Sequence, residues 1–169
     1  MVIIRSEREG DRKDLAFVNS LAFNQVNEAK LVAEIRESEN FIPELSIVAE
    51  VNGVIVGHIL LSYVELVGEE TSKVLALAPM AVLPEYQRQG IGSSLVRVGL
   101  EKADNRKEKL VVVLGHPKFY PRFGFQPAIN YGIYCPFSVP SEAFLVKPLI
   151  NYHPSMQGKI KYPPTFNEV

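Results

Sequence analysis

Residues 82–95 read Val-Leu-Pro-Glu-Tyr-Gln-Arg-Gln-Gly-Ile-Gly-Ser-Ser-Leu. An apolar stretch over 74–82 is typical of a central strand, and Gln87-x-x-Gly90-x-Gly92 then leads directly into an amphipathic helix. Glycines at a helix start let backbone N–H groups surround a phosphate, and the helix dipole favours its negative charge. The stretch therefore predicts a binding site for a cofactor that carries a diphosphate.

Size and composition are those of an ordinary globular protein. The 169 residues predict one domain over 1–169, in which 151–169 forms an irregular C-terminal wrap. The formal net charge of −1 gives no global field for nucleic acid or an anionic membrane. Cys135 is the single cysteine, which excludes an intramolecular disulfide and metal sites built on several thiolates. The sequence predicts no metal site.

The sequence also bears on localisation. Residues 1–8 form a short apolar run followed by charges, without the apolar core of a signal peptide. No run approaches the roughly 18 apolar residues of a membrane span. We therefore expect a cytoplasmic protein with no membrane partner.

The order of predicted elements is strand, two helices, three strands, helix, strand, short helix and further strands. This is a mixed α/β pattern without the regular alternation of a doubly wound nucleotide fold. Asp11 is expected to cap the first helix, and Asn52-Gly53 predicts a hairpin. Pro79 cannot donate to a ladder, so it predicts a bulge or a local parting of the central sheet. A short helical turn is expected over His116–Phe123.

Two motifs together resemble the GNAT acetyltransferase superfamily, which transfers acetyl from acetyl-CoA to an amine. Residues 87–92 match its acyl-CoA signature Gln/Arg-x-x-Gly-x-Gly/Ala, and residues 120–125 match its Tyr-x-x-x-Gly-Phe signature. The stretches 57–62, 79–92 and 119–125 resemble more closely the bacterial N-acetyltransferases of the YhbS type. The resemblance spans about residues 2–150 and implies a GNAT fold. Such a fold has a mostly antiparallel central sheet with one splayed parallel strand pair, flanked by helices.

The resemblance also implies where acetyl-CoA, as co-substrate, would bind. The pantetheine arm lies in the gap between the splayed strands, and backbone groups of the central strand hold it. The N–H of Val82 is then expected to polarise the acetyl carbonyl, as in an oxyanion hole. The residues expected to contact acetyl-CoA are Met80, Ala81, Val82, Gln87, Arg88, Gln89, Gly90, Ile91, Gly92, Ser93 and Tyr120.

Tyr120 is the side chain that the resemblance implies as general acid. Its hydroxyl would protonate the departing CoA sulfur, for which a phenol near pKa 10 is a suitable donor. The alternative is a purely structural aromatic within the cluster of Phe119, Phe123 and Phe125.

The general base stays open between three residues and a water chain. An amine must lose a proton before it attacks a thioester. His58 lies on a predicted strand, and His116 lies where a helix start would lower its pKa. Glu28 precedes Ala29-x-Leu31, a segment that borders the acceptor cleft in the resembled subgroup.

The predicted function is an N-acetyltransferase in which a primary amine attacks acetyl-CoA directly in a ternary complex. The alternative is a non-catalytic acyl-CoA-binding or sensing module. A mononucleotide-binding protein is disfavoured because a Walker lysine and a ribose-binding acidic residue are absent. The acceptor class cannot be read from the sequence. A homodimer is open because GNAT relatives are often dimers.

Overall fold

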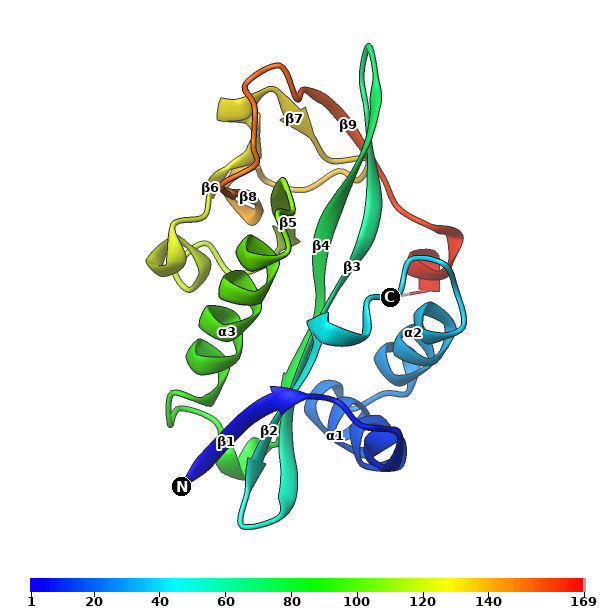
Figure 1. Ribbon diagram of the computed structural model, residues 1–169, viewed down its shortest axis with the longest axis vertical. Helices are drawn as coiled ribbons and strands as arrows, with labels where there is room; N and C mark the ends of the chain where they lie inside the picture. The colour runs from blue at the N-terminus through cyan, green and yellow to red at the C-terminus, as the bar shows by residue number, and fades with distance from the viewer. Residues whose placement is uncertain (169) are drawn as a thin grey trace. The chain divides into compact units, whose positions relative to one another are not determined.

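A mixed β-sheet with helices beside it forms the framework of the chain (Figure 1). The structure is a computed structural model and describes residues 1–168. The strand order is β1-β2-β3-β4-β5-β8-β6, and β9 pairs with both β3 and β7. The strands are β1 (Val2–Ser6), β2 (Ser46–Val51), β3 (Val54–Val67), β4 (Thr71–Val82), β5 (Leu110–Leu114), β6 (Gln126–Pro127), β7 (Ile133–Tyr134), β8 (Phe144–Pro148) and β9 (Gly158–Lys161). The α-helices are α1 (Arg12–Phe23), α2 (Asn27–Arg36) and α3 (Ile91–Asn105).

The contacts of the chain group these elements into two units. The first unit contains Met1–Ser62, Ala78–Lys102 and the segment that starts at Pro164. The second unit contains Tyr63–Leu77 and Ala103–Pro163. No helix among the described residues has the length and the apolar composition that crossing a bilayer requires.

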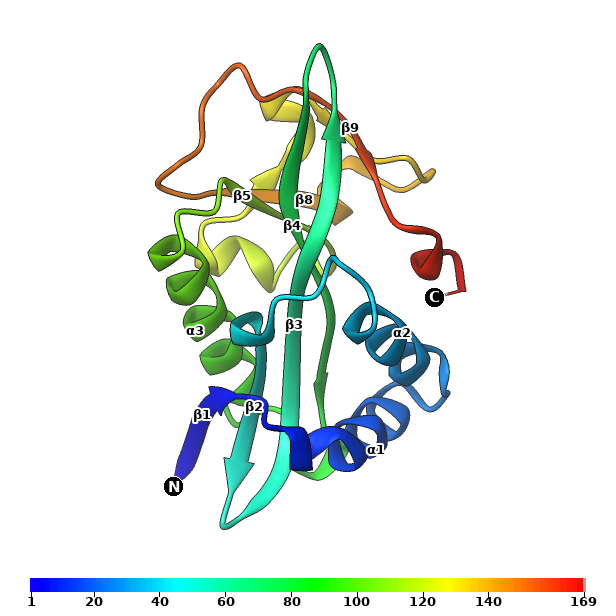
Figure 2. The same cartoon turned by 45° about the vertical axis from the view of Figure 1, so that its right-hand side comes forward.

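In the first unit, helices cover both faces of the sheet. Figure 2 shows α3 on one face of β2 and β3, with α1 and α2 side by side on the other. Gly57 of β3 faces α3, because a methyl group there would lie 3.2 Å from both Ile91 and Leu95. His58, the next residue, contacts Asn19 of α1 on the opposite face. This alternation is the period-two pattern of a strand that is covered on both sides.

In the second unit, β5 lies between β4 and β8. The parallel ladder with β4 joins Leu75 to Val111 and Ala76 to Val112, although β4 continues to Val82. The ladder thus ends before Pro79, in agreement with the predicted parting. The Ala78–Pro79 peptide bond is cis. The mixed α/β architecture and its parallel strand pair confirm the predicted fold class.

Two local predictions were only partly right. Asp11 is the N-cap residue of α1, so the helix begins where expected. The Asp11 side chain makes no capping hydrogen bond to α1. Its carboxylate instead accepts hydrogen bonds from the Arg5 guanidinium at 2.7 and 3.1 Å, and this pairing lowers the pKa of Asp11. The tail expected to be irregular contains β9, which pairs with β3 through Glu65–Lys161, Leu66–Ile160 and Val67–Lys159.

A chain of polar side chains crosses the core of the first unit. Arg36 of α2 pairs with Glu7 at 3.1 Å, and Glu7 accepts a hydrogen bond from the Ser46 hydroxyl. Ser46 Oγ lies 2.9 Å from His58 Nε2, and His58 Nδ1 lies 3.1 Å from Asn19 Nδ2. The chain therefore connects both N-terminal helices to strands β2 and β3 through buried hydrogen bonds.

The partners of His58 define its protonation. The amide nitrogen of Asn19 also donates to the Leu15 carbonyl at 2.9 Å, so this atom is a donor and His58 Nδ1 must accept. Nε2 then carries the proton and donates to Ser46. His58 is fully buried, and burial, followed by the charge of Arg36, lowers its pKa to about 3.

Replacing His58 by Gln should flatten the pH dependence of stability. Between the unfolded pKa near 6.5 and the folded value of about 3, only the unfolded chain binds a proton at His58. Unfolding is therefore favoured as pH falls through this window, by up to about 1.4 kcal/mol per pH unit. His58→Gln should lose this slope, measured by denaturant unfolding between about pH 6.5 and 5, above the range of most carboxylates. It should also be less stable at neutral pH by about 1–3 kcal/mol, because buried hydrogen bonds are lost.

The matched control is His153→Gln. His153 is exposed and hydrogen-bonds only locally to Ser155, so its replacement should leave the wild-type slope unchanged. A wild-type slope in the His58→Gln variant would contradict a neutral buried imidazole.

Candidate active site

The loop between β4 and α3 begins with a tight, hydrogen-bonded turn in the first unit. Leu83 N donates to the Val56 carbonyl at 2.8 Å, which ties the loop to β3. Gln87 Nε2 donates to the Val82 carbonyl at 3.0 Å and closes the turn. Arg88 and Gly90 then adopt left-handed backbone angles, with φ of 62° and 83°. The chain consequently exposes residues 87–90 immediately before the helix.

The start of α3 supplies main-chain donors beside this loop. Ser94 N donates to the Gly90 carbonyl at 3.0 Å, which is the first hydrogen bond of the helix. The N–H groups of residues 91–93 therefore have no acceptor within the helix. Nothing lies within 4 Å of the position that a Gly90 side chain would occupy. Arg88 is the one charged residue in 87–93. Free amides, open space and no acidic side chain suit a phosphate group.

The other predicted cofactor residues of this unit divide into exposed and buried side chains. Gln87, Arg88 and Gln89 are exposed, and Gly92 and Ser93 are half-buried. Ile91 is buried in the core, so its N–H is the group that it can offer. On β4, Met80 and Val82 are half-buried and Ala81 is buried. Side-chain burial alternates along this part of β4. The groups that all three residues, Met80, Ala81 and Val82, can offer to a ligand are therefore their backbone N–H and C=O groups.

Tyr120 lies in an aromatic cluster of the second unit. Its ring meets Phe119 edge-on at 4.9 Å between centroids and Phe125 at 5.5 Å. It begins a 3-10 helix, Tyr120–Phe123, which ends at Gly124 with φ of 93°. The ring is therefore packed among aromatic side chains, as the structural alternative predicted.

The Tyr120 hydroxyl has no hydrogen-bond partner among the described residues. The residue is 7% exposed, and burial raises the pKa of its phenol to about 12. The group therefore keeps its proton at neutral pH and can donate it to a ligand atom.

His116 lies on the same turn as Tyr120. Its carbonyl accepts hydrogen bonds from Phe119 N at 3.1 Å and Tyr120 N at 3.4 Å, and its side chain is exposed. The predicted helical turn over His116–Phe123 was only partly right, because the 3-10 helix begins at Tyr120 with Pro121 in its second position. His116 consequently does not occupy a helix N-terminus, and the predicted dipole effect on its ring has no basis in the structure.

The other two candidate bases belong to the first unit. Both ring nitrogens of His58 are engaged in the buried polar chain described above. Glu28 is half-buried in the first turn of α2 and accepts hydrogen bonds from Gln25 Nε2 at 2.9 and 3.1 Å. A carboxylate paired with a neutral amide can still accept a proton, whereas the His58 ring has no open lone pair.

Sequence reasoning did not identify Arg122 as part of the Tyr120 region. Its guanidinium lies over the Phe119 ring at 4.7 Å, and Nε donates to the Phe119 carbonyl at 3.3 Å. The available signal is the spacing of Arg122, which follows Phe119 by three residues and directly precedes Phe123 in one short helical turn. The Arg122 guanidinium packs on the exposed side of the aromatic cluster and stabilises it through a cation–π contact.

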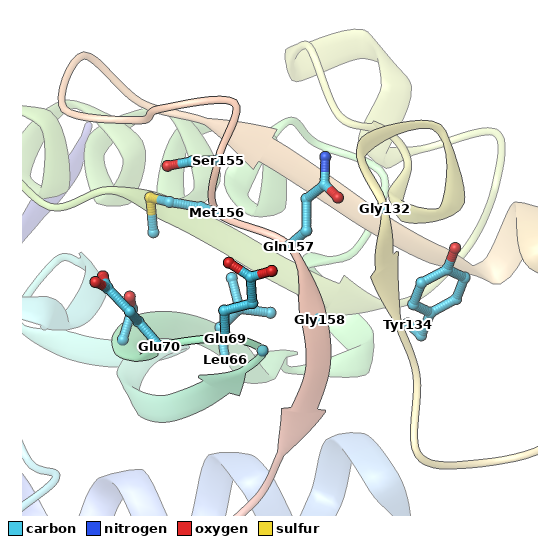
Figure 3. A pocket seen from close by; sticks show the side chains of 11 residues that line it. Leu66, Glu69, Glu70, Gly132, Tyr134, Ser155, Met156, Gln157 and Gly158 are labelled. Atoms are coloured by element: carbon cyan, nitrogen blue, oxygen red, sulfur yellow. The ribbon is translucent and has the colours of Figure 1, made fainter.

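A pocket of about 640 Å³ lies elsewhere in the second unit (Figure 3). It is lined by residues of the β3–β4 turn, of β7 and of the segment leading into β9, among them Glu69, Met156 and Gln157. None of the predicted site residues lines it. The glycine loop and the Tyr120 cluster, which carry the predicted residues, therefore lie outside this pocket.

Known proteins resemble this chain over most of its length. Residues 43–127 match the family of the acetyltransferase (GNAT) domain. The chain is 41% identical over 136 residues to the uncharacterized N-acetyltransferase YjhQ of Escherichia coli K12, covering 79% of this chain and 75% of YjhQ. It is 30% identical over 167 residues to the uncharacterized N-acetyltransferase YhbS of the same strain, covering 98% of this chain and 99% of YhbS.

Solved structures agree with this assignment. The crystal structure of E. coli YhbS in complex with CoA superimposes with a TM-score of 0.89 at 30% identity, covering 98% of this chain and 92% of that one. A GNAT family acetyltransferase from Brucella melitensis, in complex with acetyl-CoA, gives a TM-score of 0.80 at 29% identity, covering 98% of both chains. The glycine loop, the aromatic turn and these similarities lead to one conclusion. The chain belongs to the GNAT acetyltransferase family.

Proposed function

We propose that this GNAT acetyltransferase transfers acetyl from acetyl-CoA to a primary amine. The observation that carries the proposal is the exposed glycine loop at the start of α3, with its free amides and left-handed Gly90. Relatives of the same fold were crystallised with CoA and with acetyl-CoA, which supports the same ligand here. A screen of CoA release across amine classes, followed by mass spectrometry of the product, tests the proposal directly.

In this proposal, main-chain donors hold the diphosphate of CoA. The amides of residues 87–93 surround the phosphates, and Arg88 adds a charged contact at the exposed side of the loop. Met80–Val82 offer backbone groups to the pantetheine arm where β4 has left its ladder with β5. Because these groups are fixed before binding, little reorganisation is required when the ligand enters.

The amine attacks the thioester directly, without a covalent acetyl-enzyme. The N–H of Val82 stabilises the negative charge that develops on the acyl oxygen, and Tyr120 donates a proton to the departing sulfur. Cys135, the single thiol, does not suit a nucleophile, because partial burial raises its pKa.

Among the candidate bases, we assign proton removal to His116. His58 is buried with both ring nitrogens engaged, whereas the His116 side chain is exposed on the turn that carries Tyr120. Glu28 and a water chain are the alternatives, and a His116→Gln variant that retains turnover would favour them.

A non-catalytic acyl-CoA-binding module is the competing function. The Tyr120 hydroxyl argues against it, because it has no hydrogen-bond partner among the described residues and can therefore donate to a ligand atom. Acetyl-CoA binding without transfer to any amine of the screen would favour the binding module.

Ser93→Glu should weaken CoA binding without destabilising the protein. Ser93 lies in the first turn of α3, where a carboxylate stabilises the helix dipole by about 0.3–1 kcal/mol. The same charge would repel the diphosphate by about 1–3 kcal/mol. We expect the Kd for CoA, measured by calorimetry, to rise roughly 10- to 100-fold while the melting temperature stays constant or rises.

Ser93→Gln is the matched control, since it has the length of glutamate without its charge. It should bind CoA more tightly than Ser93→Glu. Wild-type CoA affinity in the glutamate variant would exclude this loop as the phosphate site.

Tyr120→Phe should reduce kcat far more than it reduces affinity for acetyl-CoA. The substitution removes one oxygen and keeps the ring packing with Phe119 and Phe125. Loss of a general acid lowers turnover by roughly 10²–10⁴-fold. Steady-state kinetics and calorimetry on the same preparation measure both quantities.

Tyr134→Phe controls for removing a phenol from the same unit, because Tyr134 is 51% exposed. It should retain wild-type kcat. Equal turnover in the Tyr120→Phe and Tyr134→Phe variants would eliminate Tyr120 as the acid.

A further inference from the structure

Gly115, at the end of β5, lies directly against the ring of Tyr120. A methyl group at Gly115 would lie 2.7 Å from Tyr120 Cδ2 and 3.3 Å from Cζ, and closer still to Cε2. Real Cβ atoms essentially never approach another heavy atom within 3.0 Å. Gly115 does not have a left-handed φ, so its requirement is steric rather than conformational. The ring edge next to the hydroxyl occupies the space that any side chain at this position would fill.

The backbone at Gly115 cannot easily retreat from the ring. Leu114 pairs with Phe144 in the antiparallel β5–β8 ladder. Gly115 N continues the pairing by donating to the Ala143 carbonyl at 3.0 Å. Moving the backbone away would break these ladder hydrogen bonds, which hold the end of β5 against β8.

The ring itself is confined on its other sides. Phe119 and Phe125 meet it edge-on at centroid distances of 4.9 and 5.5 Å, and Phe125 is 2% exposed. Interiors packed at this density do not absorb an added methyl group without displacing a neighbour. A side chain at Gly115 would therefore move the Tyr120 ring and, with it, the hydroxyl.

We infer that Gly115 is a positioning residue for the general acid. Because it has no side chain, the Tyr120 ring can lie against the backbone of β5, and this contact fixes the position of the Tyr120 hydroxyl. The inference rests on the proposed function, which gives Tyr120 its proton-donating role. It assigns to Gly115 an effect on turnover that acts through Tyr120 and not through the binding of CoA.

The test is Gly115→Ala made in the wild-type and in the Tyr120→Phe background. A displacement of about 1 Å in a catalytic group can lower turnover on the order of 10²-fold. We expect a loss of this order in the wild-type background and less than about 3-fold in the Tyr120→Phe background, where no hydroxyl remains to misplace. The Kd for acetyl-CoA should be unchanged in both. The melting temperature should fall by the same amount in both, because phenylalanine keeps the same ring carbons.

Gly10→Ala controls for the loss of a glycine, since nothing lies within 4 Å of its added methyl group. It should retain wild-type kcat. An equal loss of kcat from Gly115→Ala in both backgrounds, or no loss in the wild-type background, would overturn the inference and leave the acid role of Tyr120 intact. Failure of the acid role itself would appear separately, as full turnover in the Tyr120→Phe single variant.

A second pair of variants keeps the inference testable if Gly115→Ala does not fold. Tyr120→Ala removes the ring, so adding Gly115→Ala to it should not lower the melting temperature further. Restored folding in the double variant would support the contact. A double variant with a melting temperature clearly below that of Tyr120→Ala alone would refute it.

Discussion

The close approach of helix α3 to strands β2 and β3 is the constraint on which the candidate cofactor loop depends. Gly57 and Gly99 make it possible, since a methyl group at Gly57 would press on Ile91 and one at Gly99 would lie 3.1 Å from Leu61. Ile91 is the first residue of α3 and is buried, so the helix start is anchored to β3. The free N–H groups at the start of α3 are therefore held in a fixed position. Main-chain donors that bind a phosphate need this preorganisation.

The parts of this site that could be predicted are those with a local cause. Glycine and asparagine adopt left-handed backbone angles most easily, so these residue types by themselves predicted turns at Gly90 and at the Asn52-Gly53 hairpin. The structure gives Gly90 a φ of 83°. Pro79 lacks an N–H, which was enough to predict that the parallel ladder stops near it. In each case the residue type itself decides which backbone angles or hydrogen bonds are available at that position, whatever the rest of the chain does.

The parts that could not be predicted depend on partners far away in the sequence. Asp11 was expected to cap a helix, but the guanidinium of Arg5 offers a stronger, charged hydrogen bond. The pairing of β9 with β3 joins residues almost a hundred positions apart, for which the sequence of the tail has no visible signal. The role of His58 likewise depended on Asn19, whose place beside it follows from the packing of α1 on β3.

The burial of Tyr120 affects its proposed chemistry in two opposing ways. A phenol whose pKa lies at about 12 keeps its proton at neutral pH, yet it is a weaker acid than the ideal donor, whose pKa would lie near the operating pH. Tyr120 cannot gain rate from a matched pKa, so any contribution must come from where its proton is held. The ring packing, tight against Gly115 and between Phe119 and Phe125, restricts that position. The aromatic cluster that lowers the acidity of Tyr120 thus also fixes its orientation, and in the proposed mechanism this orientation is what Tyr120 contributes to proton transfer to the departing sulfur.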